Sequence, residues 1–131
     1  MKKPVWLDRE VALAIHELML AQHGGLAGVR DEGLLESALS KPRNLFAYGK
    51  PTVAQLAASY AAGIIRNHPF LDGNKRTGFM LAATFMELNG LTLTASEESV
   101  VQQTLALAAG ELKEASYAAW LKENSRKASS R

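Results

Sequence analysis

Most of the side chains in this sequence that could do chemistry lie in one short polar segment, residues 68–78, which reads HPFLDGNKRTG. His68 is the group there suited to accept a proton from a hydroxyl, because imidazole titrates near neutral pH. Asp72 suits Mg²⁺, which takes few protein carboxylates and completes its shell with phosphate oxygens and water. These residue types indicate a metal-assisted phosphoryl- or nucleotidyl-transfer site.

The second half of this segment is predicted to bind the phosphates. A helix is expected to start near Asn74, and the first N–H groups of a helix lack intrahelical partners and attract anions. Gly73 lets a ligand approach the backbone, while Lys75 and Arg76 add two full positive charges. The predicted nucleotide-binding residues are Gly73, Asn74, Lys75, Arg76 and Thr77, and Arg76 is also expected to act in catalysis.

Two apolar helices are predicted to hold this segment between them. Residues 52–67 begin with a Thr-x-x-Gln capping box, and Pro69 disfavours helical geometry at His68, so this helix should end there. The apolar run over residues 79–88 continues the helix that starts near Asn74, and Asn89-Gly90 should stop it. We expect these two helices to be the central pair of the fold.

Each of these residues alone also has an ordinary structural interpretation. A histidine before proline is typical of a helix end, and Asp72-Gly73-Asn74 is typical of a turn. Lys75-Arg76 alone is typical of a solvated helix face. Their combination in this order, between two apolar helices, favours a functional site.

The rest of the chain is predicted to be mostly helical. Asp8 should cap a helix ending at residues 23–25, and Asp31 should cap a short helix that Pro42 ends. Residues 41–51 lack a helical period and are expected to form a connection. A capping box at Thr94-x-x-Glu97 should start a helix that runs to Gly110, and a last helix is expected over residues 112–124.

Smaller features of the sequence give further expectations. Residues 4–7 are predicted to form a brief strand that pairs with residues 91–94, whose pattern alternates. The first helix should bury one apolar face, formed by Val11, Ala14, Ile15, Leu18 and Met19. His16 and His23 lack a partner at a metal-ligand spacing, so surface or helix-end positions are expected for both.

Composition limits the class of protein. The chain has 131 residues, a formal net charge of +2 and no cysteine. We expect a single domain over residues 1–124 and a disordered polar tail over residues 125–131. The charge does not indicate nucleic-acid binding, and the lack of cysteine fits a reducing cytoplasm. No apolar run reaches about 18 residues and no signal peptide is evident, so neither a membrane span nor export is expected.

The polar segment resembles the signature loop of the Fic/Doc family, whose adenylylating members carry His-Pro-Phe-x-(Asp/Glu)-Gly-Asn-Gly-Arg. Lys75 stands where those enzymes have their second glycine, and Asn-Lys-Arg is the pattern of the Doc, or death-on-curing, branch. The Gly-Val-Arg-Asp…Leu-Leu-Glu-Ser-Ala segment over residues 28–38 and the Tyr-Ala-Ala-Trp-Leu segment over residues 117–121 are similar to that branch as well.

The resemblance implies an all-α Fic/Doc-like bundle with the signature loop between two central helices, and at most a short two-stranded β element. It implies His68 as general base, Asp72 as the Mg²⁺ ligand, and Asn74 and Arg76 as phosphate-holding groups for ATP. It also assigns residues 41–51 to a flap over the active site. By another interpretation these residues are an ordinary loop with Phe46 in the core.

The Doc branch implies a kinase toxin that phosphorylates a threonine of elongation factor Tu and is restrained by an antitoxin. Lys75 supports kinase activity over AMP transfer, because it fills the space of a glycine and adds a charge that favours binding of a terminal phosphate next to His68. The inhibitory motif (Ser/Thr)-x-x-x-Glu-(Gly/Asn) has no match here: Gly28 precedes Glu32-Gly33 at its spacing, and Ala119 precedes Glu123-Asn124. Two other functions stay open, an adenylyltransferase and a non-catalytic binding module.

Overall fold

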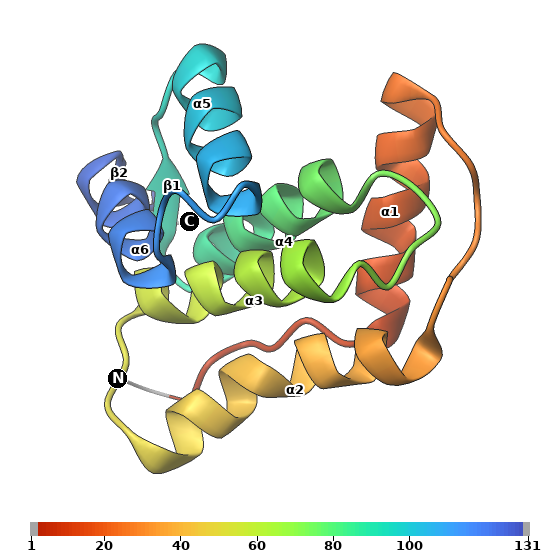
Figure 1. Cartoon of the computed structure of the whole chain (residues 1–131). Helices are drawn as coiled ribbons and strands as arrows, with labels where there is room; N and C mark the ends of the chain where they lie inside the picture. Colours follow the sequence, from red (N-terminus) through yellow and green to blue (C-terminus); the bar gives the residue numbers. More distant parts are fainter. Residues whose placement is uncertain (1–2, 130–131) are drawn as a thin grey trace.

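The computed structural model describes residues 3–129, and these form a helical bundle with one small sheet (Figure 1). The elements, in order, are α1 (Arg9–His23), α2 (Glu32–Tyr48), α3 (Val53–Asn67), α4 (Asn74–Leu88), β1 (Leu91–Leu93), α5 (Glu97–Ala108), α6 (Glu114–Glu123) and β2 (Ser125–Lys127). The all-α class and the short two-stranded element expected from the sequence are confirmed. No helix within residues 3–129 is long and apolar enough to cross a membrane.

Helix α3 lies at the centre of the bundle, with α2 and α4 along its sides and α6 across its first half (Figure 1). Small residues let these helices approach closely. A Cβ atom on Gly63 would lie 3.2 Å from Ala38 of α2, and a Cβ atom on Gly78 of α4 would lie 3.0 Å from Ile65 of α3. The predicted central pair, α3 and α4, is confirmed.

Local capping signals fix several helix starts as predicted. Asp8 accepts a hydrogen bond from the Val11 N–H at the start of α1, and Asp31 accepts one from the Leu34 N–H at the start of α2. The capping box of Thr52 and Gln55 has both of its hydrogen bonds. These polar side chains satisfy N–H groups that the helices cannot satisfy themselves.

The predicted end of α2 at Pro42 is wrong. The helix continues to Tyr48, so most of the predicted connection and flap over residues 41–51 is helical. Pro42 removes one helical hydrogen bond, but its ring is buried. Beyond it, Phe46 meets Trp6 edge-to-face at 5.7 Å between ring centroids, and Arg43 lies 5.3 Å from the Trp6 ring centroid. These tertiary contacts stabilise the last turns of the helix.

The predicted strand at residues 4–7 is wrong too. The Asn89 side chain accepts from the Val5 N–H at 2.8 Å and donates to the Val5 carbonyl at 3.0 Å, so a side chain satisfies this backbone. Strand β1 pairs instead with β2, antiparallel, with Thr92 opposite Arg126. Part of the expected disordered tail, residues 125–127, is therefore a strand, and residues 130–131 lie outside the described part.

Two helices differ from their predictions in register. The α5 cap is Ser96, which accepts from the Ser99 N–H, and not Thr94 of the predicted capping box. The buried residues of α1 are Ala12, Ile15, His16 and Met19, whereas Val11, Ala14 and Leu18 are exposed. The α1 face is thus rotated by one position, and this rotation buries a histidine.

Candidate active site

The signature loop, residues 68–78, begins where α3 ends. The His68 N–H closes the last helical hydrogen bond to the Ile64 carbonyl at 3.0 Å, and His68 itself adopts a left-handed conformation with φ 53° and ψ 50°. Pro69 cannot continue the helix and disfavours helical geometry before it. The chain therefore turns away at His68 and leaves its imidazole exposed.

The imidazole of His68 is oriented by its own helix. Nδ1 lies 3.3 Å from the Ile65 carbonyl oxygen. Because a carbonyl only accepts, this contact requires the proton on Nδ1 and leaves Nε2 with a free lone pair. In the neutral imidazole this tautomer makes Nε2 available as a base.

The loop enters α4 through Gly73, which has φ 76° and caps the helix without a side chain. The first helical bond runs from the Thr77 N–H to the Gly73 carbonyl at 3.0 Å. Within the described residues, the N–H groups of Asn74, Lys75 and Arg76 consequently have no hydrogen-bond acceptor. Three free donors and the positive end of the helix dipole form a cradle for an anion.

Two side chains predicted to bind the nucleotide point into the protein instead. Asn74 is 4% exposed, and its amide accepts from the Phe70 N–H and donates to the Phe70 carbonyl, both at 3.0 Å. Thr77 is fully buried, and its hydroxyl has no partner in the described part of the chain. The Asn74 side chain holds the loop closed, so Asn74 offers a ligand its backbone N–H, and the structure does not bring the Thr77 hydroxyl to the surface.

Asp72 lies at the tip of the loop with its carboxylate exposed. Oδ1 accepts from the Gly73 N–H at 2.9 Å and Oδ2 accepts from the Leu26 N–H at 3.2 Å. Each oxygen keeps a lone pair for a cation. Gly25 allows this arrangement, because a Cβ atom there would lie 2.9 Å from Oδ2.

His16 of α1 packs against the signature loop. The sequence had predicted a surface or helix-end position for it. It is 3% exposed, stacks on Phe70 with ring centroids 3.9 Å apart, and its Nε2 donates to the Asp72 carbonyl at 2.8 Å. The expectation of a surface histidine was wrong because α1 is rotated by one position. A search of neighbouring helical registers in α1 would have placed His16 beside Ala12 and Met19.

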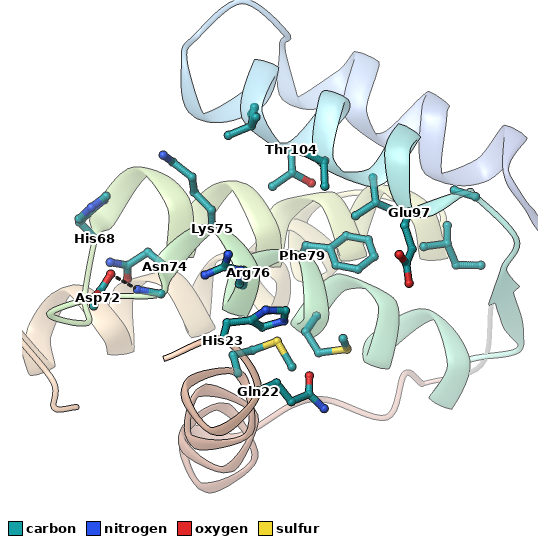
Figure 2. Close-up of a pocket in the computed structure, with 18 of the residues that line it drawn as sticks. Gln22, His23, His68, Asp72, Asn74, Lys75, Arg76, Phe79, Glu97 and Thr104 are labelled. Carbon is teal, nitrogen blue, oxygen red and sulfur yellow. Dashed lines mark hydrogen bonds between the residues drawn. The ribbon is translucent and has the colours of Figure 1, made fainter. Parts of the chain in front are cut away.

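A cavity of about 780 Å³ opens beside the loop, between α1, α4 and α5. In Figure 2, His68 and Asp72 lie at one end of it and Arg76 projects toward its middle, while Glu97 and Thr104 line the α5 side. Its polar end consists of His68 and residues 72–76. The rest is mainly apolar, with side chains from α1, α4, β1 and α5: Met19, Phe79, Met80, Leu93, Val100, Val101 and Leu105.

The donor set at the polar end fits a metal nucleotide better than a metal alone. Within residues 3–129, no three histidine or acidic side chains gather closely enough to hold an ion. Mg²⁺, however, needs only one or two carboxylates when phosphate oxygens supply other ligands. The Asp72 carboxylate beside three free N–H groups satisfies that requirement.

A left-handed histidine at a helix end, an anion cradle at the next helix start and one exposed carboxylate between them thus lie together at the polar end of the cavity. The chain belongs to the Fic/DOC family, whose family model matches residues 6–86, from the N-terminal segment to α4.

Two relatives define the branch. Toxin Doc from Mycolicibacterium smegmatis is 39% identical over 93 residues, which cover 69% of this chain and 68% of the relative. Protein kinase doc from Escherichia phage P1 is 32% identical over 113 residues, which cover 86% of this chain and 89% of the relative. The Doc branch inferred from Lys75 is thereby confirmed.

Proposed function

We propose that this chain is a Doc-type toxin that transfers the terminal phosphate of Mg-ATP to a threonine of elongation factor Tu in the cytoplasm and so stops translation. The observation that carries the proposal is the juxtaposition of His68 and Asp72 with the three free N–H groups at the start of α4. The printed names of the two relatives, a toxin and a protein kinase, support the class. The choice of elongation factor Tu rests on the family resemblance.

The proposed base is Nε2 of His68. Its lone pair is free because Nδ1 donates to the Ile65 carbonyl, so it can take the proton of an incoming hydroxyl. A positioned base of this kind typically contributes about 10²- to 10⁴-fold to the rate. His68 therefore assists the attack, while binding of the nucleotide depends on other groups.

The start of α4 provides the proposed phosphate site. The backbone N–H groups of Asn74, Lys75 and Arg76 bind phosphate oxygens, and the Arg76 guanidinium in the cavity offsets charge that develops on them. Asp72 holds Mg²⁺ through the carboxylate oxygens that face solvent. Mg-ATP, when bound, would supply the phosphoryl group: the threonine oxygen would bond to the γ-phosphorus, the bond from that phosphorus to the β,γ-bridging oxygen would break, and ADP would leave.

Lys75 is the residue that favours transfer of phosphate over transfer of AMP. It lines the cavity at the first turn of α4, where its ammonium adds a compact charge beside the cradle. We infer that this charge holds the terminal phosphate next to His68. An adenylyltransferase with the same residues is the alternative, because the cradle alone accepts either end of a triphosphate.

Labelled ATP separates these two reactions. Purified elongation factor Tu is incubated with this protein and Mg²⁺, and with ATP labelled at either the γ- or the α-phosphate. Label from the γ-position alone is expected on the factor. Label from the α-position would establish AMP transfer. A lack of both labels on the factor, with a protein that still inhibits growth, would contradict elongation factor Tu as the substrate.

We further propose that an antitoxin helix occupies the apolar part of the cavity. Val101 and Leu105 are about half exposed there, on the side of α5 that faces α4 and α1. A largely disordered partner segment with apolar residues at i, i+3, i+4 and i+7 could fold into such a groove. The chain alone should then inhibit growth, and co-expression of the neighbouring open reading frame should restore growth.

A further inference from the structure

Arg30, in the connection between α1 and α2, donates hydrogen bonds to three consecutive carbonyl groups at the end of α3. Its backbone N–H donates to the Pro69 carbonyl at 2.6 Å. Its side-chain Nε donates to the His68 carbonyl at 2.7 Å, and its Nη2 donates to the Asn67 carbonyl at 2.9 Å. The final carbonyls of a helix lack intrahelical partners. Arg30 alone therefore provides hydrogen-bond donors for the three carbonyl groups where the chain turns at His68.

These contacts coincide with the strained position in the loop. Among residues 3–129, His68 is the sole residue other than glycine with a positive φ. Such a conformation costs about 1–2 kcal/mol for a residue with a Cβ atom, and it persists when surrounding contacts determine it. The guanidinium of Arg30 donates hydrogen bonds to the peptide groups on both sides of the His68 Cα. These contacts hold the backbone of His68 in its left-handed conformation.

The direction of the imidazole depends on this backbone geometry. Nδ1 reaches the Ile65 carbonyl at 3.3 Å, a long contact that a small rotation at His68 would break. Loss of the contact would also release the tautomer that leaves Nε2 free. The orientation of the imidazole and its tautomer therefore both depend on the backbone contacts that Arg30 makes.

We propose that Arg30 is a positioning residue that acts on the reaction through His68 and not through the phosphate site. The proposal rests on the proposed function of His68 as base. Arg30 does not line the cavity, and its contacts end at the peptide groups of residues 67–69. The planar fork of a guanidinium matches two neighbouring carbonyls, whereas a lysine ammonium is a single point charge.

The first test compares Arg30→Gln with Arg9→Gln. Arg9 is a matched control, because it is also exposed and joins α1 to α2 through Glu32 but does not contact the signature loop. We expect kcat for phosphate transfer to fall about 10- to 100-fold in Arg30→Gln, with KM for Mg-ATP changed less than about twofold, since misplacement of a catalytic group by about 1 Å has effects of this size. Arg30→Lys should be intermediate. A rise in KM with kcat unchanged would overturn the proposal.

A double-mutant cycle tests whether the effect passes through His68. In a His68→Ala background, adding Arg30→Gln should leave the residual transfer rate within about twofold, because no imidazole is left to position. If Arg30→Gln lowers the rate by the same factor with and without His68, Arg30 acts elsewhere, and the proposal is wrong.

A measurement without substrate separates this proposal from the proposed function. In the full chain, the ¹³Cα and ¹³Cβ chemical shifts of His68 report its left-handed backbone. Arg30→Gln should move them toward extended values, and Arg9→Gln should leave them unchanged. Unchanged shifts in Arg30→Gln would overturn the positioning role even if phosphate transfer is established. If the shifts change in Arg30→Gln but the wild type transfers no phosphate, Arg30 does hold the His68 backbone and the proposed reaction is wrong.

Discussion

His68 and Asp72 are held in place by backbone contacts, and both are exposed where they would meet substrate. His68 stands at the C-terminal end of α3 in a left-handed conformation, and Asp72 is bonded to the Gly73 and Leu26 N–H groups. Neither side chain contributes to the apolar core. Substitutions here should therefore affect chemistry more than stability.

Replacing His68 with alanine should lower phosphate transfer about 10²- to 10⁴-fold, because the proposed base is lost. Stability should change by less than about 0.5 kcal/mol, as is usual for exposed positions. His68→Asn provides the control for the backbone, since asparagine tolerates the left-handed conformation. Transfer rates and urea unfolding measure both effects. A His68→Asn variant with the wild-type rate would exclude a base at this position.

Gly25→Ala should disturb Asp72 directly. The added Cβ atom would lie 2.9 Å from Oδ2, and φ at Gly25 is +125°. Gly24→Ala is the matched control, because φ there is +77° but nothing lies within 4 Å of the added atom. Both variants should lose about 1–3 kcal/mol of stability, because these backbone conformations are strained for a residue with a Cβ atom. Gly25→Ala alone should require a higher Mg²⁺ concentration for half-maximal transfer, and an equal requirement in both variants would argue against Asp72 as the metal ligand.

At single residues, sequence reasoning succeeded where the chemistry is local. The end of α3 at His68 follows from Pro69, and the free N–H groups follow from the helix start at Asn74, whereas the left-handed conformation of His68 was not predicted, because a following proline favours extended geometry. The inward side chains of Asn74 and Thr77 could not be predicted from the same pattern, because their direction depends on packing against residues outside the loop. His16 was missed for a related reason: its partners, Phe70 and Asp72, are more than fifty residues away in sequence.

The helices that position the site were predicted where a cap or a breaker acts alone. The Thr52 capping box and the stop at Asn89-Gly90 required no knowledge of tertiary contacts. Pro42 was a misleading signal, because contacts of Trp6 with Phe46 and Arg43 keep α2 helical beyond it. The partner of β1 depends likewise on a chain segment more than thirty residues later.

The apolar groove between α1, α4 and α5 should respond to a charge on α5. Val101→Glu should weaken antitoxin binding by at least about tenfold, because a buried carboxylate would lie in an apolar contact. Leu88→Glu is the control, since Leu88 is 51% exposed against 55% for Val101 but lies outside the cavity. Calorimetric titration with the antitoxin measures the affinity. Equal binding by the two variants would place the antitoxin elsewhere.

The whole bundle is closed on one side by α5 and α6, which share a buried hydrogen bond. The hydroxyl groups of Thr104 and Tyr117 lie 3.0 Å apart. Burial of the Tyr117 phenol raises its pKa to about 12, although the bond to Thr104 acts in the other direction. Ionisation of this phenol therefore opposes the packing of the two helices.

This shift makes stability depend on alkaline pH. The folded protein holds the Tyr117 proton up to about pH 12, whereas an unfolded tyrosine loses it near pH 10. The contribution is complete below pH 10, and the free energy of unfolding should fall by about 1.4 kcal/mol per pH unit between pH 10 and 12. Tyr117→Phe should lose about 1 kcal/mol at pH 7 but show a shallower alkaline decline. Urea unfolding at several pH values measures this, with the exposed Tyr48→Phe as control; parallel declines in both variants would contradict it.

The most direct test of the proposed function is the intact mass of elongation factor Tu after incubation with this protein and Mg-ATP. We expect the factor to gain the mass of one phosphate, on a threonine. In the same incubation time it should gain at least about 100-fold less phosphate when His68→Ala replaces the wild type, and none when Mg²⁺ is removed. A gain of AMP would contradict kinase activity and establish adenylylation. An unmodified factor in the presence of wild-type protein that still arrests growth would contradict elongation factor Tu as the substrate.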